Sequence, residues 1–454
     1  MTDAEMALKL AEEIDKKGGN AYYVGGFVRD SVLGKESKDI DIEIHGITND
    51  TLIEILDSLG HRMIIGESFG VYALKGYSID IAFPRKERQT GNKHTDFEIS
   101  LDPFIGTYKA CMRRDFTINS MMKNVLTGEI IDHFGGLEDL KQGIIRHTNV
   151  ETFKEDPLRV LRGCQFASRF GFKIHDDTIK LCSELDLSTL SKERVFAELQ
   201  KALLKSDKPS VFFEYLREMN QLKTFFPELE NLIDVVQNKK YHGEGDVWNH
   251  TMMVLDECAK LREKVNNKTG FMLSALTHDF GKAVCTEIRE DGKIISYGHE
   301  IQGIPLVKTF LSRITNEKSL IQYVTNMTKL HMRPNALADL NAKTKSTNRL
   351  FDESCDPLDL VYLSIGDNYG RISEDGIIDH SPYLFEKLNI YEEMMKLPYV
   401  SGEDLINMGL KPGKDFSLYL EYAHKLRLNG TPKEQALKEV KQYIKNTERK
   451  NGNI

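Results

Sequence analysis

The stretch that most constrains this chain is a glycine turn between a short apolar run and the start of a helix. Residues 22–30 read Tyr-Tyr-Val-Gly-Gly-Phe-Val-Arg-Asp. The pattern predicts a strand, a tight turn at Gly25 and Gly26, and a helix that opens with the cationic Arg29. Glycines let the backbone approach a ligand closely, and free N–H groups at a helix start attract phosphate. We therefore expect this turn to bind phosphate groups.

A strand of alternating apolar and acidic residues follows the turn. Residues 39–44 alternate strictly, so period-two geometry places their three isoleucines on one face of a sheet. Asp39, Asp41 and Glu43 then share the other face. Neighbouring carboxylates repel each other unless a cation lies between them, and Mg²⁺ prefers hard oxygen ligands together with a substrate phosphate. The phosphate turn and the carboxylate pair together predict two-metal phosphoryl or nucleotidyl transfer.

Composition sets the outer limits of these predictions. The 454 residues are enough for about three domains, and no run of about eighteen apolar residues predicts a membrane span. The acidic N-terminus lacks an apolar segment, which argues against secretion, and the six cysteines are scattered without a CxxC pair. We expect reduced thiols in a cytoplasmic protein. The net charge of -8 leaves room for a local basic surface, because electrostatic steering depends on how charges are distributed.

The elements expected in the rest of the N-terminal region are helices over residues 3–17 and 48–59 and strands near 63–65, 71–74 and 78–83. Asp80 alternates with apolar neighbours in the last of these strands. If that strand lies beside the carboxylate strand, Asp80 becomes a third carboxylate that faces the metals. Residues 85–100 are polar and lack periodicity, which is typical of a mobile loop.

A paired-arginine motif, Arg113-Arg114-Asp115, stands beyond this loop at the entry to another element. Two adjacent guanidinium groups can hold a triphosphate, and the carboxylate can accept a hydrogen bond from a ribose hydroxyl. The motif alone is typical of a surface. Its functional interpretation depends on the turn and the carboxylates upstream.

The pattern becomes helical downstream of this motif. Residues 155–162 read Glu-Asp-Pro-Leu-Arg-Val-Leu-Arg and predict a helix with Pro157 in its first turn. Asp156, Arg159 and Arg162 are spaced three apart, so they share one face of such a helix. A solvated ion pair is the structural alternative for this spacing.

Histidines and aspartates gather in the second half of the chain. They are His250, the adjacent His278 and Asp279, and further on His299, His331 and Asp367. A single histidine on an apolar helix is usually a core residue, but several of these fall at helix ends in one region. Imidazole and carboxylate together suit transition metals such as manganese, nickel, cobalt, iron or zinc. The region therefore predicts a metal site, and a helical tail follows it.

Several motifs, in their order along the chain, strongly resemble those of the class II tRNA nucleotidyltransferases, the bacterial CCA-adding enzymes of the polymerase-β superfamily. They are GGFVRD (25–30), DID (39–41), RRDFTIN (113–119), FGGLEDLKQGIIRH (134–147), EDPLRVLR (155–162) and ERVFAEL (193–199). These strings cover roughly the first half of the chain. The second half resembles the HD-domain phosphohydrolase extension of some members, through EGDVWNH (244–250), His278-Asp279 and GDNYGR (366–371).

The resemblance implies roles for residues in the first half. Asp39 and Asp41 match the two magnesium ligands, and Asp80 matches the position of the third carboxylate. The nucleotide-binding matches are Gly25, Gly26 and Arg29 in the triphosphate turn, Arg114, Asp115 and Asn119 at ribose and phosphates, and Asp156, Arg159 and Arg162 at the base. The family often has arginine where this chain has Gln165, so we give a phosphate contact there little weight.

Asp156 and Arg159 match the amino-acid template that reads the incoming base. Cytosine and adenine each present an exocyclic amine beside a ring-nitrogen acceptor, so a carboxylate and a guanidinium can accept C or A and leave G or U mismatched. One such bidentate match discriminates by about 1–3 kcal/mol. The implied reaction is attack of the tRNA 3′-hydroxyl on the α-phosphorus of CTP or ATP, with release of pyrophosphate and no nucleic-acid template. Switching from C to A would require the pocket to readjust, and the polar loop is the expected lever.

For the HD region, the resemblance assigns as metal ligands His250, His278, Asp279 and Asp367. His299 and His331 match positions for a second metal or a substrate phosphate. Because many members lack these residues, their presence predicts an active phosphohydrolase, which would act on 2′,3′-cyclic or terminal phosphates of damaged RNA ends. The alternative is a domain that only binds the body of the tRNA.

The fold expected is α+β, a polymerase-β-type nucleotidyltransferase head with a small mixed sheet followed by helical parts. Its domains would be the head (1–145), a helical neck with the template (146–240), the HD domain (241–375) and a helical tail (376–454) that contacts tRNA. The tRNA would be held through its phosphates and the shape of its acceptor stem.

Two alternatives for the function stay open at this point. A poly(A) polymerase, or an enzyme that adds only CC or only A, is the closer one, although the polar loop before the RRD motif favours full CCA addition. An HD phosphohydrolase with an inert transferase half belongs to another class. The intact DID, RRD and EDxxR strings argue against it.

Overall fold

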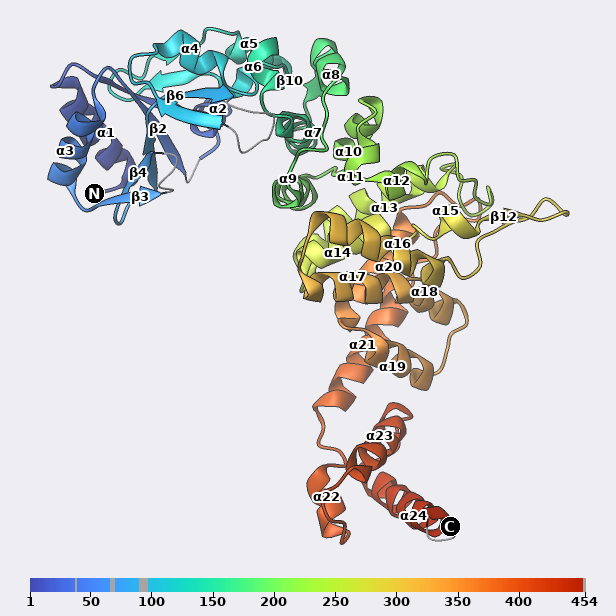
Figure 1. Ribbon diagram of the computed structural model, residues 1–454. Helices are drawn as coiled ribbons and strands as arrows, with labels where there is room; N and C mark the ends of the chain where they lie inside the picture. The colour runs from blue at the N-terminus through green and yellow to red at the C-terminus, as the bar shows by residue number, and fades with distance from the viewer. Residues whose placement is uncertain (37–38, 66–69, 90–96, 452–454) are drawn as a thin grey trace. The chain divides into compact units, whose positions relative to one another are not determined.

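The computed structural model describes residues 1–36, 39–65, 70–89 and 97–451, which form two compact units (Figure 1). Unit 1 is Met1–Thr224 and unit 2 is Phe225–Ile454. Unit 1 holds the large β-sheet, whereas unit 2 is helical apart from one short hairpin. The α+β class predicted from the sequence is therefore confirmed. The finer division into four domains stays a prediction.

A seven-stranded mixed sheet forms the head of unit 1. Its strands are β1 (Asn20–Val24), β2 (Ile40–His45), β3 (Arg62–Ile65), β4 (Val71–Leu74), β5 (Ile79–Ala82), β8 (Met122–Asn124) and β9 (Ile130–Ile131). They lie in the order β3-β4-β5-β2-β1-β8-β9. The pair β2 and β5 is parallel, and the other pairs are antiparallel. The strands predicted near residues 63–65, 71–74 and 78–83 are thus confirmed, and the last one does lie beside the carboxylate strand.

Helices α1 (Asp3–Asp15) and α3 (Asn49–Leu59) share the apolar core of this sheet. Thr2 and Glu5 form a capping box at the start of α1, and Thr48 caps α3. The isoleucines of β2 and the apolar stripe of α1 lie in the same core, so the strand turns its acidic side chains away from it. The remaining head helices are α2 (Gly26–Val32), α4 (Thr107–Met112), the 3-10 turn η1 (Thr117–Asn119), α5 (Gly136–Gln142) and α6 (Val150–Lys154).

The segment predicted to be a mobile loop is in part a β-hairpin. Strands β6 (Arg85–Gln89) and β7 (Phe97–Leu101) pair antiparallel with each other and form a separate two-stranded sheet. Residues 90–96, which belong to the same prediction, lie outside the described residues. Residues 97–101 do alternate apolar and polar residues, a strand signal that the prediction overlooked, whereas residues 85–89 are polar throughout and carry no such signal. The prediction of a loop over 85–100 was therefore wrong at both ends.

Unit 1 continues into a group of helices after the head. They are α7 (Leu158–Phe170), α8 (Asp176–Ser183), α9 (Lys192–Lys205), α10 (Ser210–Glu218) and α11 (Leu222–Phe225), with a parallel pair β10 (Ile144–Ile145) and β11 (Lys173–Ile174) between them. Helix α7 begins after Pro157, which is its N-cap residue and does not lie in its first turn as predicted, and it packs against both α9 and α10. Asp156 precedes the helix instead of lying on its face.

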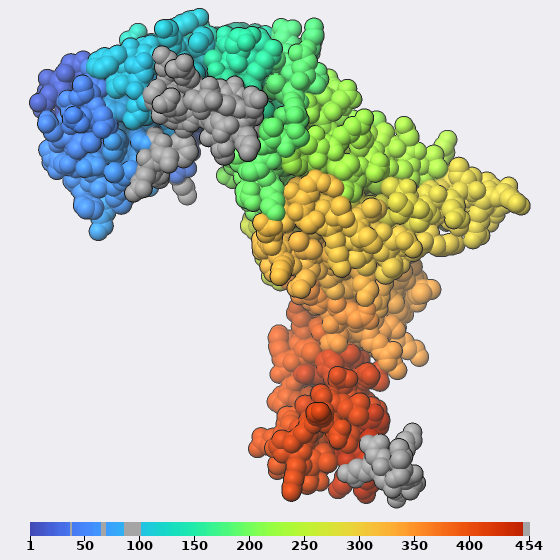
Figure 2. Space-filling model, viewed as in Figure 1, coloured from blue at the N-terminus to red at the C-terminus, as the bar shows by residue number. Residues whose placement is uncertain are grey.

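Unit 2 is a helical body with a protruding hairpin. Its helices are α12 (Pro227–Glu230), α13 (Val247–Leu261), η2 (Arg262–Lys264), α14 (Lys268–Thr277), α15 (Lys282–Cys285), α16 (His299–Ile314), α17 (Lys318–Leu330), α18 (Met332–Asp339), α19 (Thr344–Glu353), α20 (Pro357–Tyr369) and α21 (Ser381–Lys396). Helices α13, α14, α17 and α20 pack against one another. The hairpin of β12 (Glu287–Ile288) and β13 (Ile294–Ile295) projects from this body, as the space-filling view shows (Figure 2).

The chain ends in a small helical group with an apolar cluster of its own. It comprises α22 (Gly402–Asn407), α23 (Asp415–Leu428) and α24 (Lys433–Asn451). Leu405, Tyr419 and Val440 are buried at its centre. The helical tail expected from the sequence is thus present. Among the described residues, no helix is both long enough and apolar enough to cross a membrane.

Candidate active sites

The carboxylates of the head lie on the parallel strand pair. Asp41 on β2 is directly opposite Asp80 on β5, and Asp39 stands at the bend before β2. Asp39 and Asp80 are exposed and Asp41 is half-buried. Burial raises the pKa of Asp41, and the charges of Asp80 and Asp39 act in the same direction while Arg114 opposes them. The structure therefore brings together the three carboxylates predicted from the sequence.

This donor set fits a divalent cation such as Mg²⁺. Mg²⁺ is usually held by one or two carboxylates, with substrate phosphates and water completing its shell. Among the described residues, the groups with three or more ligand atoms within 4.8 Å of one another all lie in unit 2. The head carboxylates are thus an open, oxygen-only set on the central strand pair of the sheet. Such a set suits an ion shared with a substrate better than an ion enclosed by protein.

The glycine turn lies directly against these groups. Gly25 has a φ of 63°, a left-handed value that favours glycine. A Cβ at this position would lie 3.9 Å from Arg114 Nη1 and 4.0 Å from Asp41 Oδ2. The turn, the carboxylate strand and the arginine motif therefore meet at one point.

Arg114 is oriented by a residue to which the sequence analysis assigned no role. Its Nη2 donates to Glu43 Oε2 at 2.8 Å, and His45 Nε2 lies 3.0 Å from Glu43 Oε1. Burial alone would raise the pKa of Glu43, but Arg114 and His45 outweigh it and hold that pKa below its usual value. Glu43 is therefore an ionised anchor for the Arg114 guanidinium. Its place on the acidic face of β2 was the available signal.

A chain of polar contacts connects the glycine turn with the helices behind it. Arg29 donates to Asp30 Oδ1 and, through Nη1, to Asn119 Oδ1 at 2.7 Å. Asn119 in turn donates to Asp115 Oδ1 at 3.0 Å, and Arg162 Nε donates to Asp115 Oδ2 at 2.8 Å. These side chains come from α2, the arginine motif, η1 and α7, so the contacts fix the four segments relative to one another.

The pKa of Asp115 shows that its carboxylate is ionised within this set of polar contacts. Burial alone would raise that pKa, but the Arg162 guanidinium and the hydrogen bonds from Asn119 and Arg162 hold it below its usual value. The carboxylate is 8% exposed. An ionised Asp115 in this position keeps Arg162 at the wall of the site.

The predicted base-reading pair is engaged in contacts within the protein. Asp156 Oδ2 accepts from Arg194 Nη2 on α9 at 2.8 Å, and Asp156 Oδ1 accepts from Leu158 N at 3.1 Å. Arg159 donates to the backbone oxygens of Thr152 and Arg113, each at 2.7 Å. Asp156 and Arg159 are thus close neighbours, and each side chain is also held by other groups of unit 1. Arg194 occurs in the ERVFAEL string, but its link to Asp156 had no signal in the sequence.

Two cavities of unit 1 collect these groups. One, of about 410 Å³, is lined by residues that include Asp41, Glu43, Asp80 and Arg114. The other, of about 650 Å³, is lined by Gly25, Gly26, Arg29, Asp115, Asn119, Asp156, Arg162 and several further arginines and lysines. Asp41, Arg114 and Arg159 line both. Gln165 also lines the second cavity, and its buried Nε2 has no hydrogen-bond partner.

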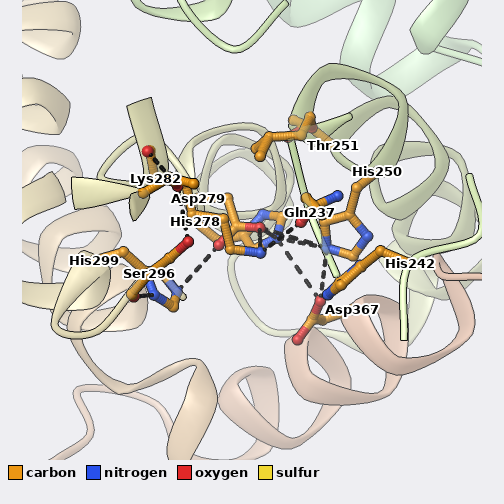
Figure 3. Close-up of polar contacts among 12 residues, drawn as sticks. Gln237, His242, His250, Thr251, His278, Asp279, Lys282, Ser296, His299 and Asp367 are labelled. Atoms are coloured by element: carbon orange, nitrogen blue, oxygen red, sulfur yellow. Dashed lines mark hydrogen bonds and ion pairs between the residues drawn. The ribbon is translucent and has the colours of Figure 1, made fainter. Parts of the chain in front are cut away.

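A second site lies in unit 2, where imidazoles and carboxylates converge (Figure 3). His250 Nε2 lies 3.1 Å from Asp367 Oδ1 and 3.3 Å from His278 Nε2. His299 Nε2 lies 3.1 Å from Asp279 Oδ1 and 3.3 Å from His331 Nε2. The four residues predicted as metal ligands and the two histidines predicted to hold a second metal or a phosphate are therefore brought together. They come from α13, α20, the α17–α18 junction, the start of α16 and the end of α14.

Each imidazole ring of this cluster is oriented by a contact to Nδ1, the ring nitrogen on the side away from the centre of the cluster. Nδ1 of His278, His299 and His331 lies 2.8, 2.8 and 2.6 Å from a backbone oxygen, and Nδ1 of His250 lies 3.0 Å from Glu244 Oε1. A ring that donates through Nδ1 turns the lone pair of Nε2 toward the centre. Burial and the neighbouring His278 and His299 lower the pKa of His331 to about 3, so its ring is neutral. Against the effect of burial, Asp367 and Glu244 raise the pKa of His250 to about 9, and Asp279 raises the pKa of His299, so a bound cation would take the place of the protons on these two rings.

Asp279 stands between the two groups of histidines. Its Oδ2 lies 3.3 Å from His278 Nε2, and its Oδ1 lies on the side of His299 and His331. The carboxylate is 1% exposed, and neither oxygen has a well-aligned hydrogen bond, although Lys282 Nζ is 2.7 Å from Oδ2. Burial would raise the pKa of Asp279, but Lys282 and the imidazoles outweigh it and hold that pKa well below its usual value. Such a donor set fits a transition metal ion.

Glu244 and Lys282 are two further residues of this site that sequence reasoning missed. Glu244 orients His250 and also lies 2.8 Å from His242 Nδ1. Lys282 is three residues after Asp279, within the string HDFGK, and that spacing was the signal available.

The head fold and its parallel carboxylate pair define a nucleotidyltransferase. The protein-family model described as "Poly A polymerase head domain" matches residues 21–146. The protein-family model described as "Probable RNA and SrmB-binding site of polymerase A" matches residues 171–233. The resemblance to the class II tRNA nucleotidyltransferases that the sequence indicated is thereby confirmed.

Curated relatives make the assignment more specific. The chain is 34% identical over 330 residues to the multifunctional CCA protein of Actinobacillus pleuropneumoniae, covering 71% of this chain and 78% of that protein. It is 36% identical over 341 residues to the multifunctional CCA protein of Pasteurella multocida, covering 72% and 78%. This chain belongs to the CCA-adding enzyme family of tRNA nucleotidyltransferases. Enzymes of this family use a divalent metal such as Mg²⁺.

Solved structures share the fold over most of the chain. The CCA-adding enzyme of Thermotoga maritima in complex with tRNA aligns over 97% of this chain and 95% of its own, with a TM-score of 0.65 and 22% identity. The enzyme of Bacillus stearothermophilus in complex with CTP aligns over 99% and 100%, with a TM-score of 0.64 and 19% identity.

Proposed function

We propose that the head of this chain adds CCA to the 3′ end of tRNA from CTP and ATP without a nucleic-acid template. The observation that carries the proposal is the meeting of the glycine turn, the paired carboxylates, the RRD motif and the start of α7 around two adjoining cavities. Relatives named for CCA support it, as do structures of similar fold that hold tRNA, ATP and CTP. The cytoplasmic location expected from the sequence stays a prediction.

The roles of the head residues follow from their positions. A divalent cation held by Asp39 and Asp41, with Asp80 alongside, would neutralise phosphate charge and lower the pKa of the attacking hydroxyl when bound. Glu43 holds Arg114 at the wall of both cavities, where its guanidinium can bind triphosphate oxygens. Asp115, fixed by Asn119 and Arg162, can accept from a ribose hydroxyl.

Base selection requires an exchange of contacts. A cytosine or adenine amine would donate to Asp156 and displace Arg194, and the ring nitrogen would accept from Arg159 in place of a backbone oxygen. Guanine and uracil present the opposite groups and would leave Asp156 or Arg159 unpaired. In this arrangement the Arg194 guanidinium stays paired with the Asp156 carboxylate until a matching base displaces it.

Extension of a tRNA transcript that lacks its 3′ CCA tests the proposal. CTP alone should add C residues, and CTP with ATP should add the full CCA and stop. Products that stop at CC with both nucleotides present would indicate a partial enzyme, and long A tails would indicate a poly(A) polymerase. No extension would contradict the proposal.

We further propose that the histidine cluster of unit 2 is a metal-dependent phosphohydrolase centre that acts on 2′,3′-cyclic or terminal phosphates of RNA ends. Six buried or half-buried ligands, each ring oriented through Nδ1, support a metal ion such as Ni²⁺, Mn²⁺, Co²⁺ or Fe²⁺. When bound, such an ion polarises a phosphoryl oxygen and activates water. His250, His278, Asp279 and Asp367 would hold it, and His299 and His331 would hold a second ion or a phosphate.

Metal analysis of the purified full-length protein tests this second proposal. Bound transition metal that is removed by chelation, together with phosphate release from RNA with a 2′,3′-cyclic end, is the expected result. A protein that binds no transition metal after incubation with these ions would contradict it and would leave the domain a tRNA-binding element.

A further inference from the structure

The unit 2 site opens into a small cavity that is lined by two cationic side chains as well as by carboxylates. Its volume is about 140 Å³, and its lining includes the ligands His250, Asp279 and Asp367, the cations Lys282 and Arg371, and Asp339, which is paired with His380. Ligand pockets for whole small molecules are usually about 300–1,000 Å³. This cavity therefore accepts one compact group and leaves the rest of a substrate outside.

Arg371 is the cation of this wall that the protein does not neutralise. Its Nε is buried without a hydrogen-bond partner, and among the described residues no carboxylate forms an ion pair with it. One guanidinium nitrogen donates to Asn368 Oδ1, and Asn368 itself is anchored to Ile378 O at 2.7 Å. A buried N–H without an acceptor costs about 1–3 kcal/mol, so an anion at this position would be stabilised.

The backbone on both sides of Arg371 is fixed to the ligand-bearing helices. A Cβ at Gly370 would lie 2.5 Å from Val254 Cα, so α20 and α13 touch at this residue. On the other side, Ile372 N donates to Glu244 Oε2 at 2.8 Å, and Ile372 O accepts from Gly243 N at 2.7 Å. Glu244 also orients His250, so the position of Arg371 is tied to that of the ligands.

Lys282 adds a second cation, which is already partly engaged. Its Nζ lies 2.7 Å from Asp279 Oδ2 and donates to Gln237 Oε1 at 2.9 Å. Lys282 is 8% exposed. A tetrahedral oxyanion between the ligands and Arg371 would thus meet two cations. The Arg371 guanidinium donates to Asn368 but is not neutralised by a carboxylate of the described residues, and the Lys282 ammonium is paired with Asp279.

We infer that Arg371, with Lys282 beside it, binds the oxygens of a terminal phosphoryl group and thereby limits this centre to phosphate ends. This inference rests on the proposed hydrolase function and adds to it the group that recognises the substrate. The cavity is too small for a nucleoside, so an internal phosphodiester with chain on both sides does not fit. Arg371 is a binding residue in this account, so its substitution should leave the cluster of histidines unchanged.

Calorimetric titration of the full-length, metal-loaded protein with inorganic phosphate tests the inference. Arg371→Gln keeps a polar side chain that can still reach Asn368, and we expect it to weaken phosphate binding at least tenfold without changing the metal content. Arg371→Lys should retain part of the affinity. Arg333→Gln is the matched control, because Arg333 lies on the neighbouring α18, is paired with Glu353 and does not line the cavity.

The outcomes separate this inference from the hydrolase proposal. Equal phosphate affinity in Arg371→Gln and the unaltered protein would overturn the inference, as would a loss of metal or of thermal stability that accounts for the weaker binding. Phosphate binding that depends on Arg371, in a protein that hydrolyses no phosphate end, would support the subsite and overturn the hydrolase. Hydrolysis of RNA with an internal diester only, at the rate of a terminal phosphate, would overturn the end restriction.

Discussion

At the scale of single residues, Asp156 has two competing partners. It is held by Arg194 in this structure, and the base-reading proposal requires it to accept from the amine of an incoming nucleotide. The pair is one-third to two-fifths exposed, so Arg194 is a modest competitor that a well-aligned base can replace. Discrimination then depends on Asp156 and not on the ion pair.

Substitution of Asp156 tests this account. Asp156→Ala removes the acceptor for the exocyclic amine, so the preference in kcat/KM for CTP over UTP should fall by about 1–3 kcal/mol. Glu155→Ala is the control, because Glu155 pairs with Arg113 and has no place in the template. The preference is measured on a tRNA transcript that lacks its 3′ end. An unchanged preference in Asp156→Ala would contradict the template.

Asp115 and Arg162 supply a pH-dependent contact within unit 1. The pKa of Asp115 is held below its usual value in the folded state, so this carboxylate stabilises the fold above its unfolded pKa of about 3.9. That stabilisation is lost as the pH falls through the folded-state pKa. At neutral pH, Asp115→Asn should lower the free energy of unfolding by about 3 kcal/mol, because Arg162 loses its nearest carboxylate and is left with Glu198 at 3.8 Å.

The difference in thermal midpoint between the unaltered protein and Asp115→Asn reports this contact. It should be largest at neutral pH and should shrink below about pH 4. Asp207→Asn, at an exposed bend of the same unit, serves as the control for loss of a carboxylate. A difference that grows as the pH falls would contradict the assignment.

At the scale of elements, the contact between α13 and α20 positions the unit 2 site. A Cβ at Gly366 would lie 2.3 Å from Cys258 Sγ, and one at Gly370 would meet the α13 backbone. His250 is on α13 and Asp367 is on α20, so the spacing of the two helices sets the distance between these ligands.

Gly366→Ala should therefore destabilise unit 2 by about 1–3 kcal/mol through overpacking and should weaken metal binding. The obstructing atom is a side-chain sulfur, so adding Cys258→Ala should restore both the thermal midpoint and the metal content. Cys258→Ala alone controls for the cavity that it leaves. Failure of the second substitution to rescue the first would show that the helix contact is not what limits the site.

The helices and strands also show how much of the fold could be predicted from the sequence. Strand β2 and the glycine turn were predictable because period-two alternation and a glycine pair are local signals. Strand β7 carries the same alternation over residues 97–101 and could have been predicted, whereas its partner β6 is polar throughout and could not. The convergence of His250, Asp279 and His331 was expected from histidines that fall at helix ends in one region, and the resemblance assigned their roles, although their helices are distant in sequence. The contacts of Arg194 and Arg371 depend on tertiary packing, which no local pattern encodes.

At the scale of the whole molecule, each site draws its residues from one compact unit. The head site uses segments between Gly25 and Lys205 of unit 1, and the histidine site uses segments between Gln237 and Arg371 of unit 2. Neither site needs a side chain of the other unit to complete it. The two activities should therefore be separable by mutation within a folded full-length chain.

Two double variants test this independence. Asp39→Ala with Asp41→Ala should abolish nucleotide addition to tRNA and leave metal content and phosphate release by unit 2 unchanged, because the head loses its cation ligands. His278→Ala with Asp279→Ala should do the reverse. Asp50→Ala with Glu54→Ala, on the exposed side of α3, controls for the loss of two carboxylates. If either active-site variant loses both activities while its thermal midpoint matches that of the control, the two sites are coupled and the assignment of one activity to each unit is wrong.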